Sequence, residues 1–216
     1  MKILQTDDFH PLSLHDGETL QLIDVFHVHG KKTIQLHPHS SLTYLVVGSD
    51  VDIDIVIETA WPFCSCTVFW LFMAAADHPV TGSLKISLNH PHTSANVEMI
   101  SFLYDGAKIS VDGSIAISKY LHHVHGRLLE RSIILGKNTS ITTLPKLTVA
   151  SYDVTAAHGA SIDTLDQQKL FYMMSRGLSQ QQSQTLLVDW YIDYVLQHFP
   201  QSSDLEKQII STILKH

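Results

Sequence analysis

The most constraining feature of this sequence is a long succession of short apolar segments with no helix between them. From about residue 17 to residue 157, alternating or continuous apolar stretches are separated by Gly, Asn, Asp and Pro. Ile109 and Val111 alternate with polar neighbours, Gly113 interrupts, and the alternation resumes at Ile115. Because no helical period of about ten residues separates these segments, a doubly wound α/β sheet is disfavoured, and a sandwich, a barrel or a β-solenoid remains.

Composition and charge narrow the class further. Hydrophobic residues make up 44% of the 216 residues and charged residues 16%, below the share of about 25% that is usual in soluble domains. This balance indicates a strand-rich globular protein rather than a disordered chain. The formal net charge of -7, with no local cluster of Lys and Arg, predicts that nucleic acid is not a partner.

The last quarter of the chain has a helical pattern instead. We therefore divide the chain into a β core over residues 1–160 and a helical region over residues 161–216. Three potential capping boxes, each a hydroxyl residue followed three positions later by Gln or Glu, mark helix starts: Thr164 with Gln167, Ser179 with Gln182, and Ser203 with Glu206. With Gly177 and Pro200 as stop signals, they predict helices over 165–176, 180–198 and 204–214.

The second predicted helix carries an apolar stripe. Its members recur at spacings of three and four residues: Leu187, Trp190, Tyr191, Tyr194 and Val195. Such a stripe packs onto the β core or binds a partner, and the sequence leaves both interpretations open.

Two cysteines, Cys64 and Cys66, are too few for a disulfide framework, so a reducing compartment is expected. The N-terminus lacks the apolar core of a signal peptide, which predicts a cytoplasmic protein. The apolar run from Trp61 to Ala76 is shorter than the ~20 residues of a membrane-spanning helix and contains Pro62, so it predicts a buried strand pair. The two thiols share a strand face, where they either ligate a metal or pack as small hydrophobes.

Histidine is unusually frequent, with 15 in the chain. Four pairs have the form His-x-His: His27 and His29, His37 and His39, His90 and His92, His123 and His125. On a strand, residues two apart share a face, so each pair offers two imidazoles to one metal ion. The alternative is that these histidines lie on a solvated face or in turns, since Pro38 and Pro91 interrupt two of the pairs. If His37 and His39 bind a metal, a metal-dependent enzyme with a cupin-like barrel is the second candidate function.

Motifs of nucleotide and acyl-transfer chemistry are missing from the sequence. It contains no Gly-x-x-x-x-Gly-Lys-Ser/Thr loop, no Gly-x-Gly-x-x-Gly turn and no Gly-x-Ser-x-Gly elbow. The chain therefore has no nucleotide site of these types.

One stretch in the last third is more specific than these patterns. Residues 153–162 read Asp-Val-Thr-Ala-Ala-His-Gly-Ala-Ser-Ile, and residues 170–177 read Leu-Phe-Tyr-Met-Met-Ser-Arg-Gly. They resemble the C-terminal signature of the SufB/SufD family of iron–sulfur cluster assembly proteins, in which a strand ending in His-Gly-Ala leads to a helix reading Leu-Phe-Tyr-Leu-x-Ser-Arg-Gly. Residues 144–149 and 113–115 resemble two further strands of the family.

The resemblance implies a right-handed parallel β-helix followed by a small C-terminal helical domain. It also implies a non-catalytic scaffold subunit, about half the length of typical members, that pairs through its β-helix with a SufB-like partner or with itself. An ABC-type ATPase similar to SufC is expected to dock on residues 170–199, with these contact residues: Leu170, Phe171, Tyr172, Arg176, Leu187, Trp190, Tyr191 and Tyr194.

The resemblance singles out His158 as the site residue. Its neighbours Ala157 and Gly159 match the SufD-type pattern, because SufB-type chains have glutamates there. In SufD-type chains this histidine lies near the dimer interface, so His158 is expected to bind a metal or a transient iron–sulfur cluster between subunits. The alternative is a histidine at a strand end that bonds to a neighbouring carbonyl group.

Overall fold

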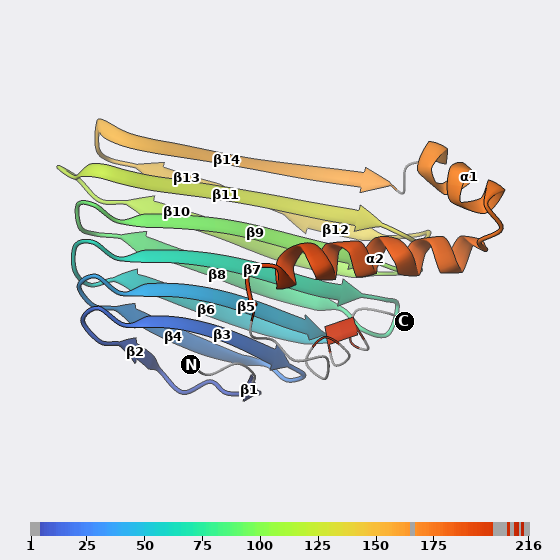
Figure 1. Cartoon of the computed structure of the whole chain (residues 1–216), viewed down its shortest axis with the longest axis horizontal. Coiled ribbons are helices and arrows are strands. Elements are labelled where there is room, and N and C mark those ends of the chain that lie inside the picture. The colour runs from blue at the N-terminus through green and yellow to red at the C-terminus, as the bar shows by residue number, and fades with distance from the viewer. Residues whose placement is uncertain (1–4, 165–166, 201–206, 208–209, 212, 214–216) are drawn as a thin grey trace.

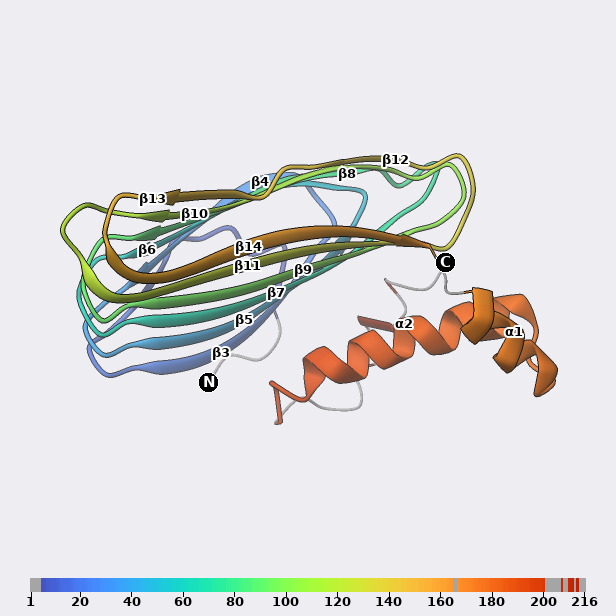
Figure 2. The same cartoon turned by 90° about the horizontal axis from the view of Figure 1, so that it is seen from above.

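The structure is a computed structural model that describes residues 5–164, 167–200, 207, 210, 211 and 213. Its strands form two sheets that lie face to face, and helices follow near the C-terminus (Figures 1 and 2). The chain passes alternately through one sheet and the other, so each turn of the chain adds a strand to both. This arrangement confirms the parallel β-helix and excludes the sandwich and the cupin-like barrel.

Sheet A contains β1 (Gln5–Thr6), β3 (Thr19–Phe26), β5 (Ser41–Ser49), β7 (Ser65–Ala74), β9 (Ser94–Leu103), β11 (His122–Ile134) and β14 (Asp153–Thr164), in that order. Sheet B contains β2 (Leu12–Leu14), β4 (Gly30–Leu36), β6 (Val51–Thr59), β8 (Val80–Leu88), β10 (Lys108–Ile117), β12 (Ser140–Thr143) and β13 (Lys146–Val149). Neighbouring strands in both sheets are parallel. The last turn of the β-helix thus has one long strand in sheet A and two short ones in sheet B.

The core lies between the two sheets and is built by residues at alternate strand positions. In β10, Ile109, Val111 and Ile115 point inward and are buried. Gly113 occupies the same inward face, and β10 pairs with β8 without a gap from Ile109 to Ile117. Gly113 interrupts the apolar alternation, as expected, but not the strand, because its missing side chain makes room for neighbours and the backbone stays extended.

The apolar run from Trp61 to Ala76 forms one strand rather than the predicted strand pair. Trp61 and Phe63 lie in an exposed turn, and residues 65–74 of the run form β7. Both faces of β7 are covered, because Trp70 points into the core between the sheets and Phe69 packs under the C-terminal helices. Burial on both faces explains the continuous apolar sequence.

The helices α1 (Gln167–Ser175) and α2 (Gln180–Leu196) follow β14. The capping box at Ser179 is confirmed: its Oγ accepts from the Gln182 amide at 3.1 Å, and the Gln182 side chain accepts from the Ser179 amide at 2.7 Å. Gly177 has φ +93° and ends α1, as predicted.

The other two boxes have different outcomes. Thr164 belongs to β14, and the side chain of Gln167 lies outside the described residues, as does the box of Ser203 with Glu206. The third predicted helix, 204–214, is described at four positions, all helical: Lys207, Ile210, Ser211 and Ile213.

Helix α2 packs across the outer face of sheet A (Figure 2). Its buried face consists of Val188, Ile192, Val195 and Leu196. Packing onto the β core is thereby confirmed, although the buried face is rotated from the predicted stripe and leaves Trp190 57% exposed. Within the described part of the chain, neither helix combines the length and apolar character needed to cross a membrane.

A buried ion pair lies in the core near the N-terminal end of the β-helix. The Lys32 ammonium group donates to Oδ2 of Asp24 at 2.6 Å, and the Tyr44 hydroxyl donates to the same oxygen at 2.6 Å. Lys32 also donates to the Asp8 carbonyl group at 3.0 Å, which ties the N-terminal segment to the core. Burial raises the pKa of Asp24, so its charge depends on these partners.

We expect Lys32→Met to lower the free energy of unfolding by roughly 3–5 kcal/mol, because it leaves the Asp24 carboxylate buried without a cation. The measurement is the urea unfolding midpoint of both proteins. The double variant Lys32→Met/Asp24→Asn removes the stranded charge and should recover much of the loss. A single variant as stable as the wild type would contradict this account.

Candidate functional site

The C-terminal end of the β-helix exposes residues that would be core residues if another turn followed. In sheet A the last strand is β14, and it is in register with β11 from Val124 onward. Inward-facing positions of β11 are buried, whereas the matching positions of β14 are half-buried or exposed: Val154, Ala156, His158, Ala160 and Ile162. Among the described residues no strand pairs with the outer edge of β14.

His158 lies in the middle of this end face. The strand continues past His158, Gly159 and Ala160 to Thr164, so the expectation of a strand that ends there is wrong. Nδ1 of His158 lies 3.1 Å from the carbonyl oxygen of Pro145, as the alternative interpretation expected. Because a carbonyl oxygen only accepts, Nδ1 carries the proton, and a neutral ring keeps its lone pair on Nε2. The bond orients the ring and leaves one nitrogen able to bind a metal.

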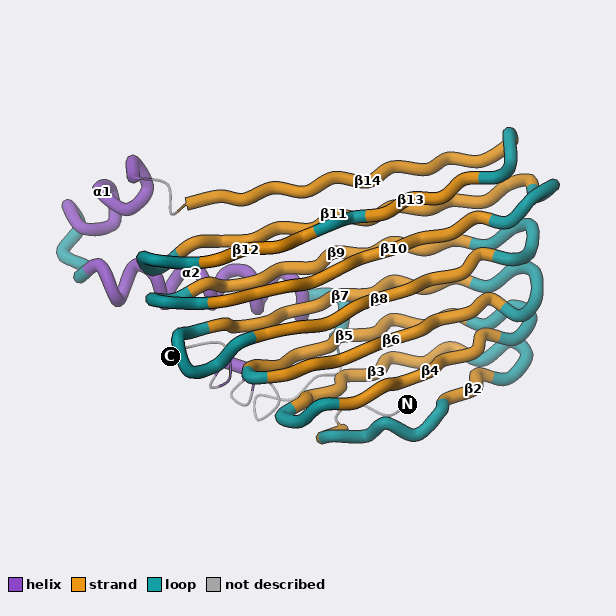
Figure 3. Tube along the Cα trace, turned by 180° about the vertical axis from the view of Figure 1, so that it is seen from behind, coloured by secondary structure: helices purple, strands orange, loops and turns teal. Residues whose placement is uncertain are grey.

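The final turn of sheet B is broken beside His158. Strand β12 pairs with residues 108–111 of β10, and β13 pairs with residues 114–117, so Leu144 and Pro145 form a gap between them (Figure 3). Asp112 and Gly113 of β10 lie opposite this gap. Because of this break, neither β12 nor β13 accepts a hydrogen bond from the Gly113 amide.

The side chain of Glu130 satisfies this amide from inside the core. Its Oε1 accepts from the Gly113 amide at 2.7 Å, and its Oε2 accepts from the Thr143 hydroxyl. A Cβ at position 113 would lie 2.5 Å from Oε1, which explains the glycine. Glu130 is 3% exposed, and burial raises the pKa of its carboxyl group despite these two hydrogen bonds.

Sequence reasoning missed Glu130, although a signal was present. Val124, Gly126 and Leu128 alternate as inward residues of one strand, and Glu130 continues that alternation with a charged side chain. A charge in an apolar series indicates a buried polar group with a specific partner.

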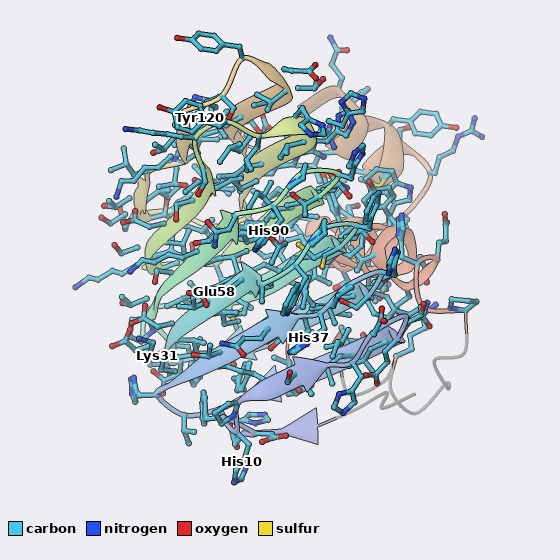
Figure 4. All side chains as sticks on the ribbon, turned by 90° about the vertical axis from the view of Figure 1, so that its left-hand side faces the viewer. His10, Lys31, His37, Glu58, His90 and Tyr120 are labelled. Carbon is cyan, nitrogen blue, oxygen red and sulfur yellow. The ribbon has the colours of Figure 1, made fainter. Side chains whose placement is uncertain are left out.

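Three of the four His-x-His pairs lie between strands, and the fourth is in β11, where a β-bulge at His123 shifts the register before His125. His37 and His39, like His90 and His92, lie in turns between strands, on the side of the β-helix that faces the viewer in Figure 4. His39 and His92 have positive φ and stack on Phe63 between them, with ring centroids 5.1 and 4.7 Å apart. Within the described part of the chain, no three His, Cys, Asp or Glu side chains are grouped so that they could hold a metal ion.

The two cysteines pack as small hydrophobes, in agreement with one of the two alternatives. The Cys64 thiol lies 3.1 Å from the carbonyl oxygen of Trp61. The equivalent position in the preceding turn of the β-helix is Ser40, whose hydroxyl donates to the His37 carbonyl group at 2.6 Å. Burial raises the pKa of Cys66 to about 12 and also raises that of Cys64. Both thiols therefore stay protonated and are poor metal ligands.

The residues expected to contact an ATPase are only partly accessible. Phe171, Tyr172 and Trp190 are exposed, and the Arg176 guanidinium group lies 5.3 Å from the centre of the Tyr172 ring. Leu170 of α1 is buried in the apolar cluster between the helices and sheet A.

The other three expected contact residues lie against sheet A. Leu187 and Tyr191 are partly buried there, and the Tyr194 hydroxyl donates to Glu98 at 3.2 Å. These contacts hold α2 to the β-helix.

Comparison with known proteins identifies the family. A family model described as "SUF system FeS cluster assembly, SufBD core domain" matches residues 24–190. The chain belongs to the SufBD core family. This match confirms the resemblance to SufB/SufD proteins and joins it to the observed β-helix.

Individual relatives of the SufBD core family are distant. An iron-sulfur cluster assembly SufBD family protein of Synechocystis sp. is 29% identical over 118 residues, which are 55% of this chain and 26% of that protein. The iron-sulfur cluster assembly protein SufD of Escherichia coli is 27% identical over 84 residues, 39% of this chain and 20% of that one. The chloroplastic protein ABCI7 of Arabidopsis thaliana is 26% identical over 117 residues, 54% of this chain and 25% of that one. The matches thus span about a quarter or less of these relatives.

We expect Glu130→Gln to become more stable relative to the wild type as the pH rises. The folded-state pKa of Glu130 is raised, so the native protein binds this proton more tightly than the unfolded chain. Its contribution is therefore complete below the unfolded pKa of about 4.3 and is lost as pH rises through the folded pKa.

Urea unfolding of both proteins at several pH values from about 4 to 8 measures this difference. Gln keeps an acceptor for Gly113 and a donor for Thr143, so the comparison isolates the charge. A stability difference that does not change with pH would contradict the assignment.

Proposed function

We propose that this protein is a non-catalytic scaffold subunit of iron–sulfur cluster assembly. It pairs through the C-terminal end of its β-helix and docks a SufC-like ABC ATPase on its helices. The observation that carries this proposal is the exposed end face with His158 at its centre, in a chain of the SufBD core family. The two unpaired, buried cysteines suit a reducing compartment such as the cytoplasm.

The end face is suited to pairing because it exposes apolar side chains on top of a continuous core. Ile162 is 54% exposed, Leu144 52% and Val149 43%. Solenoid ends need a polar cap or a partner, since each turn buries its apolar face only against the next. The free edge of β14 adds unpaired backbone groups to the same surface. A SufB-like protein or a second copy of this chain covers the face in the complex.

His158 supplies one ligand to a cargo held between the paired subunits. Nε2 of its oriented ring is a suitable ligand for iron or for an iron–sulfur cluster. In this proposal the remaining ligands belong to the partner subunit, and His158 is the ligand that this chain contributes. The cluster is therefore a transient cargo rather than a resident cofactor.

The helices offer a separate exposed surface for the ATPase. Its large apolar members are Phe171, Tyr172, Met174, Leu186 and Trp190. Aromatic residues of this kind are typical anchors of protein interfaces. The chain has no phosphate-binding loop, so the energy for any rearrangement comes from ATP bound to the partner.

We expect Ile162→Glu to prevent pairing, because it places a charge in the apolar end face. Size-exclusion chromatography with light scattering, alone and with a SufB-like partner, measures the change. Ala116→Glu on the outer face of β10 is the matched control and should leave the assembly intact. A dimer that survives Ile162→Glu would place the interface elsewhere.

We expect the double variant Phe171→Ala/Trp190→Ala to weaken binding of the SufC-like ATPase by at least tenfold, because it removes two exposed aromatic anchors. Isothermal titration with Mg-ATP present measures the affinity. Tyr120→Ala is the matched control, since Tyr120 is 94% exposed in a turn on the side of the β-helix that faces the viewer in Figure 4, away from the helices. Equal affinity in all three proteins would refute this docking surface.

A further inference from the structure

Glu130 is a buried carboxylate to which the proposed function assigns no role. Within the part of the chain that the structure describes, no Lys or Arg forms an ion pair with its carboxylate. The contrast is Asp24, the buried carboxylate at the other end of the core, which has Lys32 at 2.6 Å. Burial of a carboxylate without a cation is costly, so a cation that binds nearby would stabilise it.

The strand register places Glu130 next to His158. His158 is paired with Leu128, and Glu130 is paired with Ala160, so the two residues lie on neighbouring strands two positions apart. Both belong to the inward-facing series of their strands. From the strand spacing and rise, their Cβ atoms are about 8 Å apart, with both side chains reaching toward the same gap.

The break between β12 and β13 connects the two side chains. Thr143, the last residue of β12, donates to Glu130, and the carbonyl group of Pro145 accepts from His158. Residues 143–145 thus hold the Glu130 carboxylate below the end face and the His158 ring on its surface.

The other charged neighbours do not cancel the Glu130 charge. Asp112 is an acid on the adjoining strand and pairs with Lys146 at 3.3 Å.

We propose that Glu130 is a specificity-determining residue of the His158 site: its carboxylate supplies the negative charge that favours a cationic metal cargo at Nε2 of His158. The inference rests on the proposed function, since it takes His158 as the ligand. Glu130 acts from beneath the face through its charge, while its hydrogen bonds to Gly113 and Thr143 hold it in place. The cargo is a divalent first-row metal ion, such as ferrous iron, either alone or as an iron of a cluster with a cationic core.

The experiment is a Co²⁺ titration at pH 7.5 of the protein in its paired form, as a dimer or with a SufB-like partner, followed by the visible absorption of the bound ion. Since the chain has 15 histidines, the signal of interest is the part that His158→Ala removes. We expect Glu130→Gln to weaken this His158-dependent binding by at least tenfold, because it removes one negative charge near a divalent ion. Glu130→Asp keeps the charge and should restore most of the affinity.

Glu58→Gln is the matched control, since Glu58 lies on the outer face of sheet B (Figure 4) and should change the affinity less than twofold. Thermal unfolding of each variant at pH 7.5 confirms that it is folded. A loss in Glu130→Asp as large as in Glu130→Gln would show a purely structural role and overturn the inference.

The result also separates the two proposals. His158-dependent binding that is unchanged in Glu130→Gln would overturn the role of Glu130 and leave His158 as the cargo ligand. Co²⁺ binding that is identical in the wild type and in His158→Ala would refute the ligand itself, and with it the inference.

Discussion

The in-register stacking of parallel strands is the constraint on which the rest of the structure depends. Each turn of the chain must place its inward residues above those of the turn before, because the two sheets share one core. Register is kept from Thr19 in β3 to Thr164 in β14. A residue is therefore core or surface according to its position in the turn, and the last turn presents core positions to solvent.

This constraint explains why the candidate site lies at the C-terminal end. An interior turn would bury His158 between two neighbours, whereas the last turn leaves it exposed while its backbone stays fixed by β11. The break at Leu144 and Pro145 is tolerated there for the same reason, since only one neighbouring strand loses its partner. A rigid scaffold beneath an incomplete final layer suits a protein that holds a cargo jointly with a partner.

The two buried carboxylates, Asp24 and Glu130, have partners of different kinds. Asp24 is neutralised by Lys32 and stabilised by Tyr44, and this arrangement anchors the N-terminal segment. Glu130 has two neutral donors and faces an exposed imidazole through the break. The first arrangement is self-sufficient and structural, whereas the second leaves a charge beside an open surface, where a bound cation would stabilise it.

Four features could be predicted from the sequence: the succession of strands, the cap at Ser179, the end of α1 at Gly177 and the family signature around His158. These features depend on local periodicity, turn chemistry and short motifs, which neighbouring residues carry. Which faces are covered depends on tertiary contacts. Residues 68–74 of β7 are apolar on both faces because α2 covers the outer side, and α2 buries Val188 and Ile192 beside Val195 of the predicted stripe. Tertiary structure also brought Glu130, Gly113, Thr143 and His158 together from four strands. No local pattern encodes that meeting, because it depends on how many residues each turn of the β-helix contains.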